Sequence, residues 1–265
     1  MTSLYFLLVA LLLAPAAADE RQSLRPGPEA PIAEVAEVID GDTVVVSAPV
    51  MGATQIRLVG LQAPKLALGR EGFRPWPLAD DARRALANLV LGRRLALSFG
   101  GAERDRHGRL LAHLHTADGL WVQGEMLARG MARVYSFPDN RARVAEMLAL
   151  EAAARGAKRG IWGHPFYAVR APEDLARLTG TFQLVEGRVL RAARVKGRVY
   201  LNYGEDWRTD FTVTMDAKAG RLFRKAGADP LAFGGRRLRV RGWIKQFNGP
   251  MIEATHPEQV EVLAD

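Results

Sequence analysis

The chain has 265 residues, of which 48% are hydrophobic, and this is enough to build two small globular domains. Its formal net charge of +8 favours a polyanionic partner such as nucleic acid, or an anionic membrane surface, although a solvated basic face has the same composition. No cysteine is present, so disulfides and thiolate-bound metals are excluded.

The N-terminal segment has the pattern of a secretory signal. Residues 4–13 form an unbroken apolar run, and Pro15 and the three alanines at 16–18 follow it as a small-residue cleavage site. A run of this length is too short to span a bilayer. We expect a signal peptide at residues 1–18 and an exported protein, periplasmic or secreted, without a membrane segment after cleavage. No Lys or Arg precedes the run, so a retained N-terminal anchor is the alternative.

A flexible, proline-containing lead-in is expected at residues 19–31, and a first folded domain at residues 32–163. The patterns of apolar residues predict strands at residues 32–39, 43–47, 55–61, 94–99 and 109–115. Helical spacing predicts helices at residues 80–91, 122–129 and 141–155. This order of elements indicates an α+β domain, in which a small closed β-barrel carries its helices on one side.

A linker is expected at residues 164–179, and a second domain at residues 180–265. Strands are predicted there at residues 182–190, 198–203, 210–215, 237–245 and 251–254. One helix, at residues 218–226, separates the third strand from the fourth. Three strands, a helix and two strands are the element order of an OB-fold, so a second, smaller OB-like barrel is expected.

Four short motifs are spaced along the first domain. They are Val-Ile-Asp-Gly-Asp-Thr at residues 38–43, Arg-Leu with a later proline at 57–64, Asp-x-x-Gly-Arg at 105–109, and Gly-Ile-Trp at 160–162. Together they resemble the staphylococcal nuclease (thermonuclease) family over residues 35–162. The resemblance implies an OB barrel with three helices. It also implies a phosphodiesterase site in which calcium and two arginines hold the phosphodiester and a glutamate activates water.

The resemblance assigns roles to the residues of this chain that match the family pattern. Asp42 corresponds to a metal ligand, and Arg57 and Arg109 correspond to the arginines that clamp the phosphate. Asp40 is expected to shape the turn and to retain a weak cation. By itself, the dipeptide Asp40-Gly41 predicts only a tight hairpin turn.

Two positions depart from the family pattern, which has an aspartate and a glutamate where this chain has Gln62 and Lys65. Calcium prefers several ionised oxygen ligands, so the missing carboxylate weakens the site and the ammonium of Lys65 repels the ion. A lysine that is protonated at neutral pH cannot accept a proton from water. We therefore expect Ca2+ binding to be weakened or lost, with Asp40, Asp42 and Gln62 as the remaining ligands.

Three functions remain open at this point. In the first, which we favour, Lys65 replaces part of the metal's charge, and the protein binds DNA or RNA with a degraded catalytic site. In the second, the chain is an active endonuclease whose base has moved to Glu71 or His107. In the third, it is an envelope protein-interaction module that does not bind nucleic acid.

Further contacts to nucleic acid are predicted on both domains. Arg106 and His107 are expected to border the nucleotide, and Tyr135 lies where the family places a base-stacking tyrosine. In the second domain, basic residues alternate with aromatic ones, a pattern that suits single-stranded nucleic acid. Its main feature is a basic stripe on one strand face, formed by Arg237, Arg239 and Arg241. Trp243 lies in an apolar alternation and is expected in the core.

Overall fold

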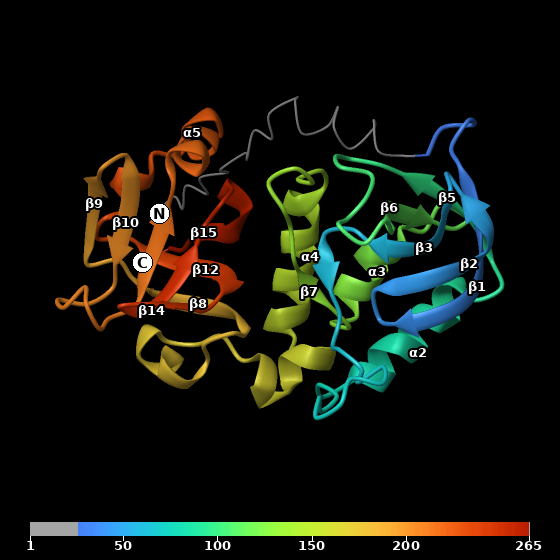
Figure 1. Cartoon of the computed structure of the whole chain (residues 1–265), viewed down its shortest axis with the longest axis horizontal. Helices are drawn as coiled ribbons and strands as arrows, with labels where there is room; N and C mark the ends of the chain where they lie inside the picture. The colour runs from blue at the N-terminus through green and yellow to red at the C-terminus, as the bar shows by residue number, and fades with distance from the viewer. Residues whose placement is uncertain (1–25, 265) are drawn as a thin grey trace, which may run out of the picture.

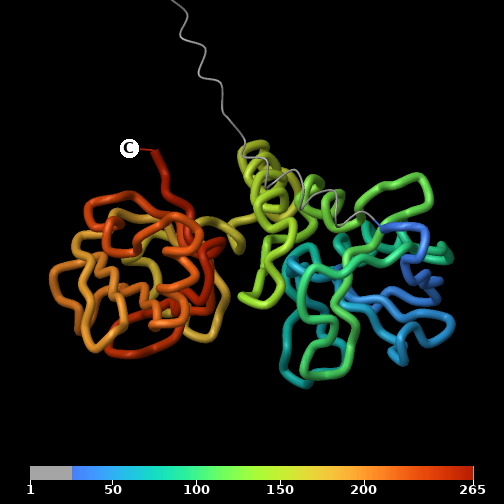
Figure 2. Tube along the Cα trace, turned by 90° about the horizontal axis from the view of Figure 1, so that it is seen from above, coloured from blue at the N-terminus to red at the C-terminus, as the bar shows by residue number. Residues whose placement is uncertain are grey.

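The computed structural model describes residues 26–264, so the predicted signal peptide lies outside the described residues. The described chain forms two units that stand side by side, with helix α4 (Val144–Gly156) between them (Figure 1). The view from above separates the same two units (Figure 2). Over residues 26–264, no helix has both the length and the apolar composition needed to cross a bilayer.

The first unit is the predicted small closed barrel, and its five strands follow the order β1-β2-β3-β6-β5. Its strands are β1 (Ile32–Asp40), β2 (Thr43–Val50), β3 (Ala53–Leu58), β5 (Arg94–Ser98) and β6 (Leu110–His115). Strands β3 and β6 pair in parallel, while the other neighbours pair antiparallel. Side chains alternate between the barrel interior and its outside, and the interior ones form one apolar core.

The three predicted helices of this unit are present. They are α2 (Ala79–Val90), α3 (Val122–Ala128) and α4. Acidic residues in the first turn of α2 favour its start, and its apolar stripe packs on the barrel core. Helix α4 begins later than residue 141, because Arg143 has a left-handed backbone conformation (φ 59°) that helical residues do not adopt.

The turn between β1 and β2 positions the acidic residues of the first motif. Asp40 pairs with Thr43, which leaves Gly41 and Asp42 as a two-residue turn. A Cβ at Gly41 would lie 2.6 Å from the Cβ of Ala63 and 2.8 Å from that of Ala82. The glycine therefore allows the turn to pack against α2 and the segment after β3.

The third strand is shorter than predicted, because Gly60 turns the chain with a positive φ of 83°. After this bend the chain forms a short strand, β4 (Leu61–Gln62), which pairs with a second short strand, β7 (Arg133–Val134). Neither strand was predicted from the sequence. The pairing places Gln62 directly opposite Arg133.

The second unit contains the five predicted strands and the helix, together with three further short strands, β9, β13 and β15, and its strands form two sheets instead of one closed barrel. The five-stranded sheet has the order β13-β14-β11-β10-β9, and the three-stranded sheet the order β15-β12-β8. The elements are β8 (Phe182–Arg188), β9 (Arg191–Val195), β10 (Arg198–Asn202), β11 (Thr212–Met215), α5 (Ala217–Lys225), β12 (Arg237–Trp243), β13 (Lys245–Phe247), β14 (Gly249–Glu253) and β15 (Val260–Val262). Strands β11 and β14 pair in parallel, as β3 and β6 do in the first unit.

Candidate functional site

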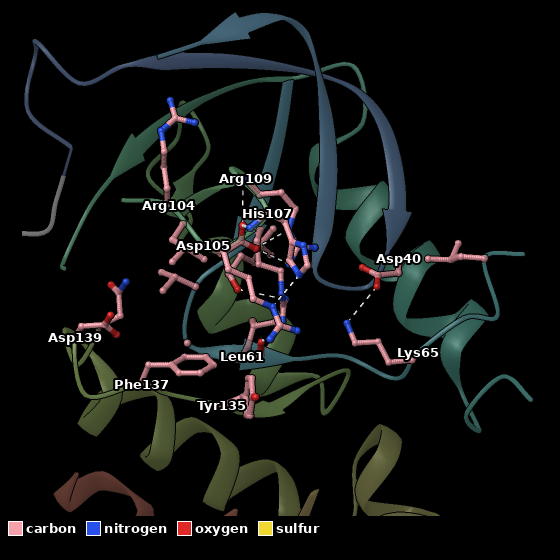
Figure 3. A pocket seen from close by; sticks show the side chains of 18 of the residues that line it. Asp40, Leu61, Lys65, Arg104, Asp105, His107, Arg109, Tyr135, Phe137 and Asp139 are labelled. Atoms are coloured by element: carbon pink, nitrogen blue, oxygen red, sulfur yellow. Dashed lines mark hydrogen bonds and ion pairs between the residues drawn. The ribbon is translucent and has the colours of Figure 1, made fainter. Parts of the chain in front are cut away.

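The arginines of the second and third motifs line one pocket of about 680 Å³ on the side of the barrel. Arg57 comes from β3 and Arg109 from the loop before β6. The same pocket is lined by five other residues that the sequence analysis named: Asp40, Lys65, Arg106, His107 and Tyr135. Lys65 and Asp40 face each other on one side of the pocket, Arg109 and His107 lie nearer its middle, and Asp139 lies on the far side (Figure 3).

Asp42 lies under this pocket and is completely buried. Its Oδ2 accepts the backbone N–H of Ala63 at 2.8 Å, and its Oδ1 lies 2.7 Å from Nη1 of Arg57. Nζ of Lys65 donates to both carboxylate oxygens, at 2.8 and 2.7 Å. Burial opposes ionisation of Asp42, but the positive charges of Arg57 and Lys65 outweigh it and hold its pKa well below the usual value.

The ammonium of Lys65 bridges the two aspartates of the turn. Its Nζ also lies 3.1 Å from Oδ2 of Asp40, so both carboxylates contact the same cation. Burial and the nearby charge of Asp42 raise the pKa of Asp40, while Lys65 lowers it. A protein cation thus lies between Asp42, which the resemblance assigns to the metal, and Asp40, which was expected to retain a weak cation.

Arg57 is held by backbone carbonyls as well as by Asp42. Nη1 donates to the carbonyl oxygen of Asp42 at 3.1 Å, and Nη2 donates to that of Leu61 at 2.9 Å. These bonds fix the plane of the guanidinium at the wall of the pocket, which is the preorganisation that anion binding requires.

Arg109 is oriented by the acid of its own motif. Asp105 accepts the backbone N–H groups of His107 and Arg109, and its Oδ2 accepts Nε of Arg109 at 2.7 Å. These bonds lower the pKa of Asp105 against the effect of its partial burial. Arg106 and His107 are exposed at the pocket rim, where Nε of Arg106 donates to Nε2 of His107 at 3.1 Å.

The expected role of Gln62 as a remaining ligand does not agree with its position. Its Oε1 accepts two hydrogen bonds from Arg133, from Nε at 3.0 Å and from Nη2 at 2.7 Å. Arg133 also donates to the carbonyl oxygen of Phe182 in the second unit, at 3.0 Å. The amide therefore holds a buried arginine at the junction of the two units, and it does not line the pocket. No signal in the sequence marked Arg133, because its partners are distant in sequence.

The basic stripe of the second unit is also placed differently from the expectation. The three arginines lie on one face of β12, but acidic side chains neutralise that face. The ion pairs are Arg237–Glu186 at 2.5 Å, Arg239–Glu186 at 2.9 Å, Arg239–Glu261 at 3.2 Å, Arg241–Glu151 at 2.9 Å and Arg241–Glu261 at 2.6 Å. Arg241 is 1% exposed, and Glu151 belongs to α4 of the first unit. Glu186 and Glu261 belong to the second unit, so Arg241 is the stripe residue whose ion pair, with Glu151, crosses to the first unit. This pairing leaves Arg239 and Arg241 unavailable to phosphates.

Tyr135 lies at the edge of the pocket that faces the second unit (Figure 3). Its ring meets those of Phe137 and Phe182 edge to face, with centroids 4.8 and 5.1 Å apart. Its hydroxyl accepts Nε1 of Trp243 at 3.0 Å. The expectation that Trp243 is a core residue is wrong, because this tryptophan is 40% exposed at the end of β12.

The barrel and the motif residues around this pocket define a protein of nuclease fold. Residues 55–164 match the family model described as staphylococcal nuclease homologue. The chain is 34% identical over 146 residues to protein ParB of Escherichia coli, and the match covers 50% of this chain and 72% of ParB. It is 33% identical over 128 residues to an uncharacterized endonuclease of Escherichia coli O157:H7, covering 48% of this chain and 74% of that protein.

A third relative is endonuclease YhcR of Bacillus subtilis (strain 168), with 30% identity over 164 residues. That match covers 57% of this chain but only 13% of YhcR, so the chain spans a small part of that relative's length. The chain belongs to the staphylococcal nuclease family.

Proposed function

We propose that this protein binds the phosphodiester backbone of nucleic acid in the pocket of Arg57 and Arg109, without calcium and with little or no hydrolysis. The observation that carries the proposal is the position of Lys65. Its ammonium contacts both Asp40 and Asp42 at 2.7 to 3.1 Å, where it supplies positive charge that the family takes from a metal.

The donor set around the turn does not fit calcium. Calcium needs six to eight oxygen ligands, preferably ionised. The carboxylates of Asp40 and Asp42 already contact Lys65, and the amide oxygen of Gln62 accepts from Arg133. Within residues 26–264, no cluster of three or more His, Cys, Asp and Glu side chains is arranged to hold a metal ion. A calcium ion would have to displace an ammonium that lies within hydrogen-bond distance of both carboxylates.

The pocket is nevertheless suited to an anion. Its lining includes six basic side chains against three acidic ones: Arg57, Lys65, Arg70, Arg104, Arg106 and Arg109 against Asp40, Asp105 and Asp139. Counting the buried Asp42 as well leaves a positive excess. Two guanidinium groups held by hydrogen bonds in one pocket are suited to bind phosphate oxygens in paired hydrogen bonds.

Loss of hydrolysis follows from the missing proton acceptor. Lys65 stands where the family has its glutamate, and an ammonium held by two carboxylates cannot take a proton from water. Glu71 does not line the pocket, while His107 lies at its rim and accepts a hydrogen bond from Arg106. Loss of a general base typically costs on the order of 10² to 10⁴ in rate.

The test measures binding and cleavage with the same fluorescently labelled oligonucleotide. We expect binding by fluorescence anisotropy to be unchanged between calcium and EDTA, to weaken as salt rises, and to leave the oligonucleotide intact. Arg57→Ala and Arg109→Ala should each lower the affinity about tenfold, because each removes a charged phosphate contact. Arg237→Ala removes a similar charge from the second unit and is the matched control.

Two results would overturn this proposal. One is cleavage by the unmodified protein that Arg57→Ala abolishes, which would make it an active endonuclease. The other is binding that is absent, or that does not respond to salt, which would indicate an interaction module.

We also propose that the protein is exported, on the basis of the apolar run at residues 4–13 and the alanines at 16–18. Expression with its own N-terminus, followed by cell fractionation and mass spectrometry of the N-terminal peptide, tests this. Recovery of the chain in the cytoplasm with its N-terminus intact would contradict it.

A further inference from the structure

A second hollow lies beside the pocket of Arg57 and Arg109 (the phosphate pocket), at the junction of the two units. Its volume is about 230 Å³, and it shares Tyr135 and Phe137 with the larger pocket. The second unit contributes Phe182 from β8 and Trp243 from the end of β12. A ligand that leaves the phosphate pocket past Tyr135 would therefore enter this hollow.

The walls of the hollow carry aromatic rings that are linked by contacts across the junction. Ring centroids are 5.1 Å apart for Tyr135 and Phe182, and 6.1 Å apart for Phe182 and Trp243. Phe137 is 45% exposed, so it and Trp243 present ring surface to solvent. The hydrogen bond from Nε1 of Trp243 to the hydroxyl of Tyr135 holds the two rings in a fixed relation.

The charges around the hollow are already neutralised. Arg241 is paired with Glu151 and with an acid of β15, and Nζ of Lys245 lies 2.7 Å from Oε2 of Glu253. Among the residues that the structure describes, both basic side chains that line the hollow are ion-paired, whereas the larger pocket also contains Arg70, Arg104 and Arg106, which are paired with no acid there. An uncharged planar group that stacks on aromatic rings fits this surface better.

We infer that the hollow takes an unpaired base from the same strand whose phosphate the larger pocket binds, so the second unit makes the protein selective for single-stranded nucleic acid. This rests on the proposed function, because the phosphate pocket must anchor the strand. Bases of a duplex are stacked inside the helix and cannot reach Trp243 without being unpaired. From the sequence, single strands were expected on the basic and aromatic residues of the second unit, but Trp243 was expected in the core and not in a binding surface.

The test compares three labelled ligands: a ten-nucleotide oligothymidine, a ten-unit abasic deoxyribose-phosphate strand, and a blunt ten-base-pair duplex. We expect Trp243→Ala to weaken oligothymidine binding about tenfold, or ~1.4 kcal/mol, while binding of the abasic strand stays unchanged. Trp243→Phe keeps a stacking ring and should restore most of the affinity. Trp207→Ala is the matched control, since Trp207 is a 52% exposed tryptophan of the same unit that does not line the hollow.

The outcomes separate this inference from the proposed function. If Arg57→Ala lowers binding of both single strands, but Trp243→Ala behaves like Trp207→Ala, the phosphate site stands and the base site is refuted. Equal affinity of the unmodified protein for duplex and oligothymidine would also refute the base site. If none of the three ligands binds, both fail. Thermal unfolding of Trp243→Phe alongside Trp243→Ala separates lost stacking from a damaged junction.

Discussion

Replacing Arg241 by methionine would remove the buried cation at the centre of the junction between the two units. Its guanidinium lies 2.9 Å from Oε1 of Glu151 and 2.6 Å from Oε1 of Glu261, and the carboxylate of Glu151 is completely buried. Burial lowers the pKa of an arginine, yet the two carboxylates raise that of Arg241. Methionine has a similar length but leaves Glu151 without this partner.

The loss of stability depends on which partners Glu151 keeps when Arg241 is replaced. Removal of one member of a buried ion pair typically costs about 3–5 kcal/mol, because the other charge is left uncompensated. Nη1 of Arg155 still lies 2.9 Å from Oε1 of Glu151, so we expect the lower end, about 3 kcal/mol. For a chain of this size that corresponds to a fall of roughly 6–12 °C in the unfolding temperature.

Denaturant unfolding followed by circular dichroism, together with calorimetry, measures this change. The matched control is Arg237→Met on the same strand, whose side chain is 51% exposed and whose ion pair should contribute about 1 kcal/mol or less. A double-mutant cycle of Arg241→Met and Glu151→Gln should return a coupling energy well above that of the exposed Arg237–Glu186 pair. Equal stability of Arg241→Met and Arg237→Met would refute a buried ionic junction. If Arg241→Met loses oligonucleotide binding but keeps its stability, the basic stripe would be a nucleic-acid surface after all.

Three further predictions concern the turn, the pocket and acidity. Gly41→Ala should destabilise the first unit by about 1–3 kcal/mol, because its Cβ would lie 2.6 Å from that of Ala63; an unchanged unfolding temperature would contradict this. Lys65→Met should weaken oligonucleotide binding and make the slope of log affinity against log salt shallower by about one; an unchanged slope would place Lys65 outside the phosphate contacts. Burial lowers the pKa of His256 to about 4, while its Nε2 lies 2.8 Å from Oγ of Ser136 across the junction. Below pH 6.5 the unfolded chain binds a proton that folded His256 excludes, so this residue lowers stability by up to ~3 kcal/mol as pH drops from 6.5 to 4. Burial also lowers the pKa of His113 to about 3 and that of His115 to about 4, so His256→Gln should make that part of the profile less steep without flattening it.

The local features of the nuclease unit could be predicted from sequence. Alternation and helical spacing identified the strands and helices, because they report directly on which side chains face a core. The turn at Asp40 and the loop that orients Arg109 each lie within a few residues, so their geometry is encoded locally. The spacing of the motifs then indicated a shared site, and Arg57, Arg109 and Lys65 do line one pocket.

The partners of the other named residues were decided by tertiary structure. Gln62 meets Arg133 across 71 positions, Arg241 meets Glu151 across 90, and Trp243 meets Tyr135 across 108. Periodicity predicts that Arg237, Arg239 and Arg241 share a face, but it carries no information about what that face contacts. Contacts between units that are distant in sequence depend on how two separately built cores dock, and only the folded chain specifies that docking. For this reason a stripe that resembles a nucleic-acid surface in sequence is a row of ion pairs in the structure, in which Arg241 joins the second unit to the first.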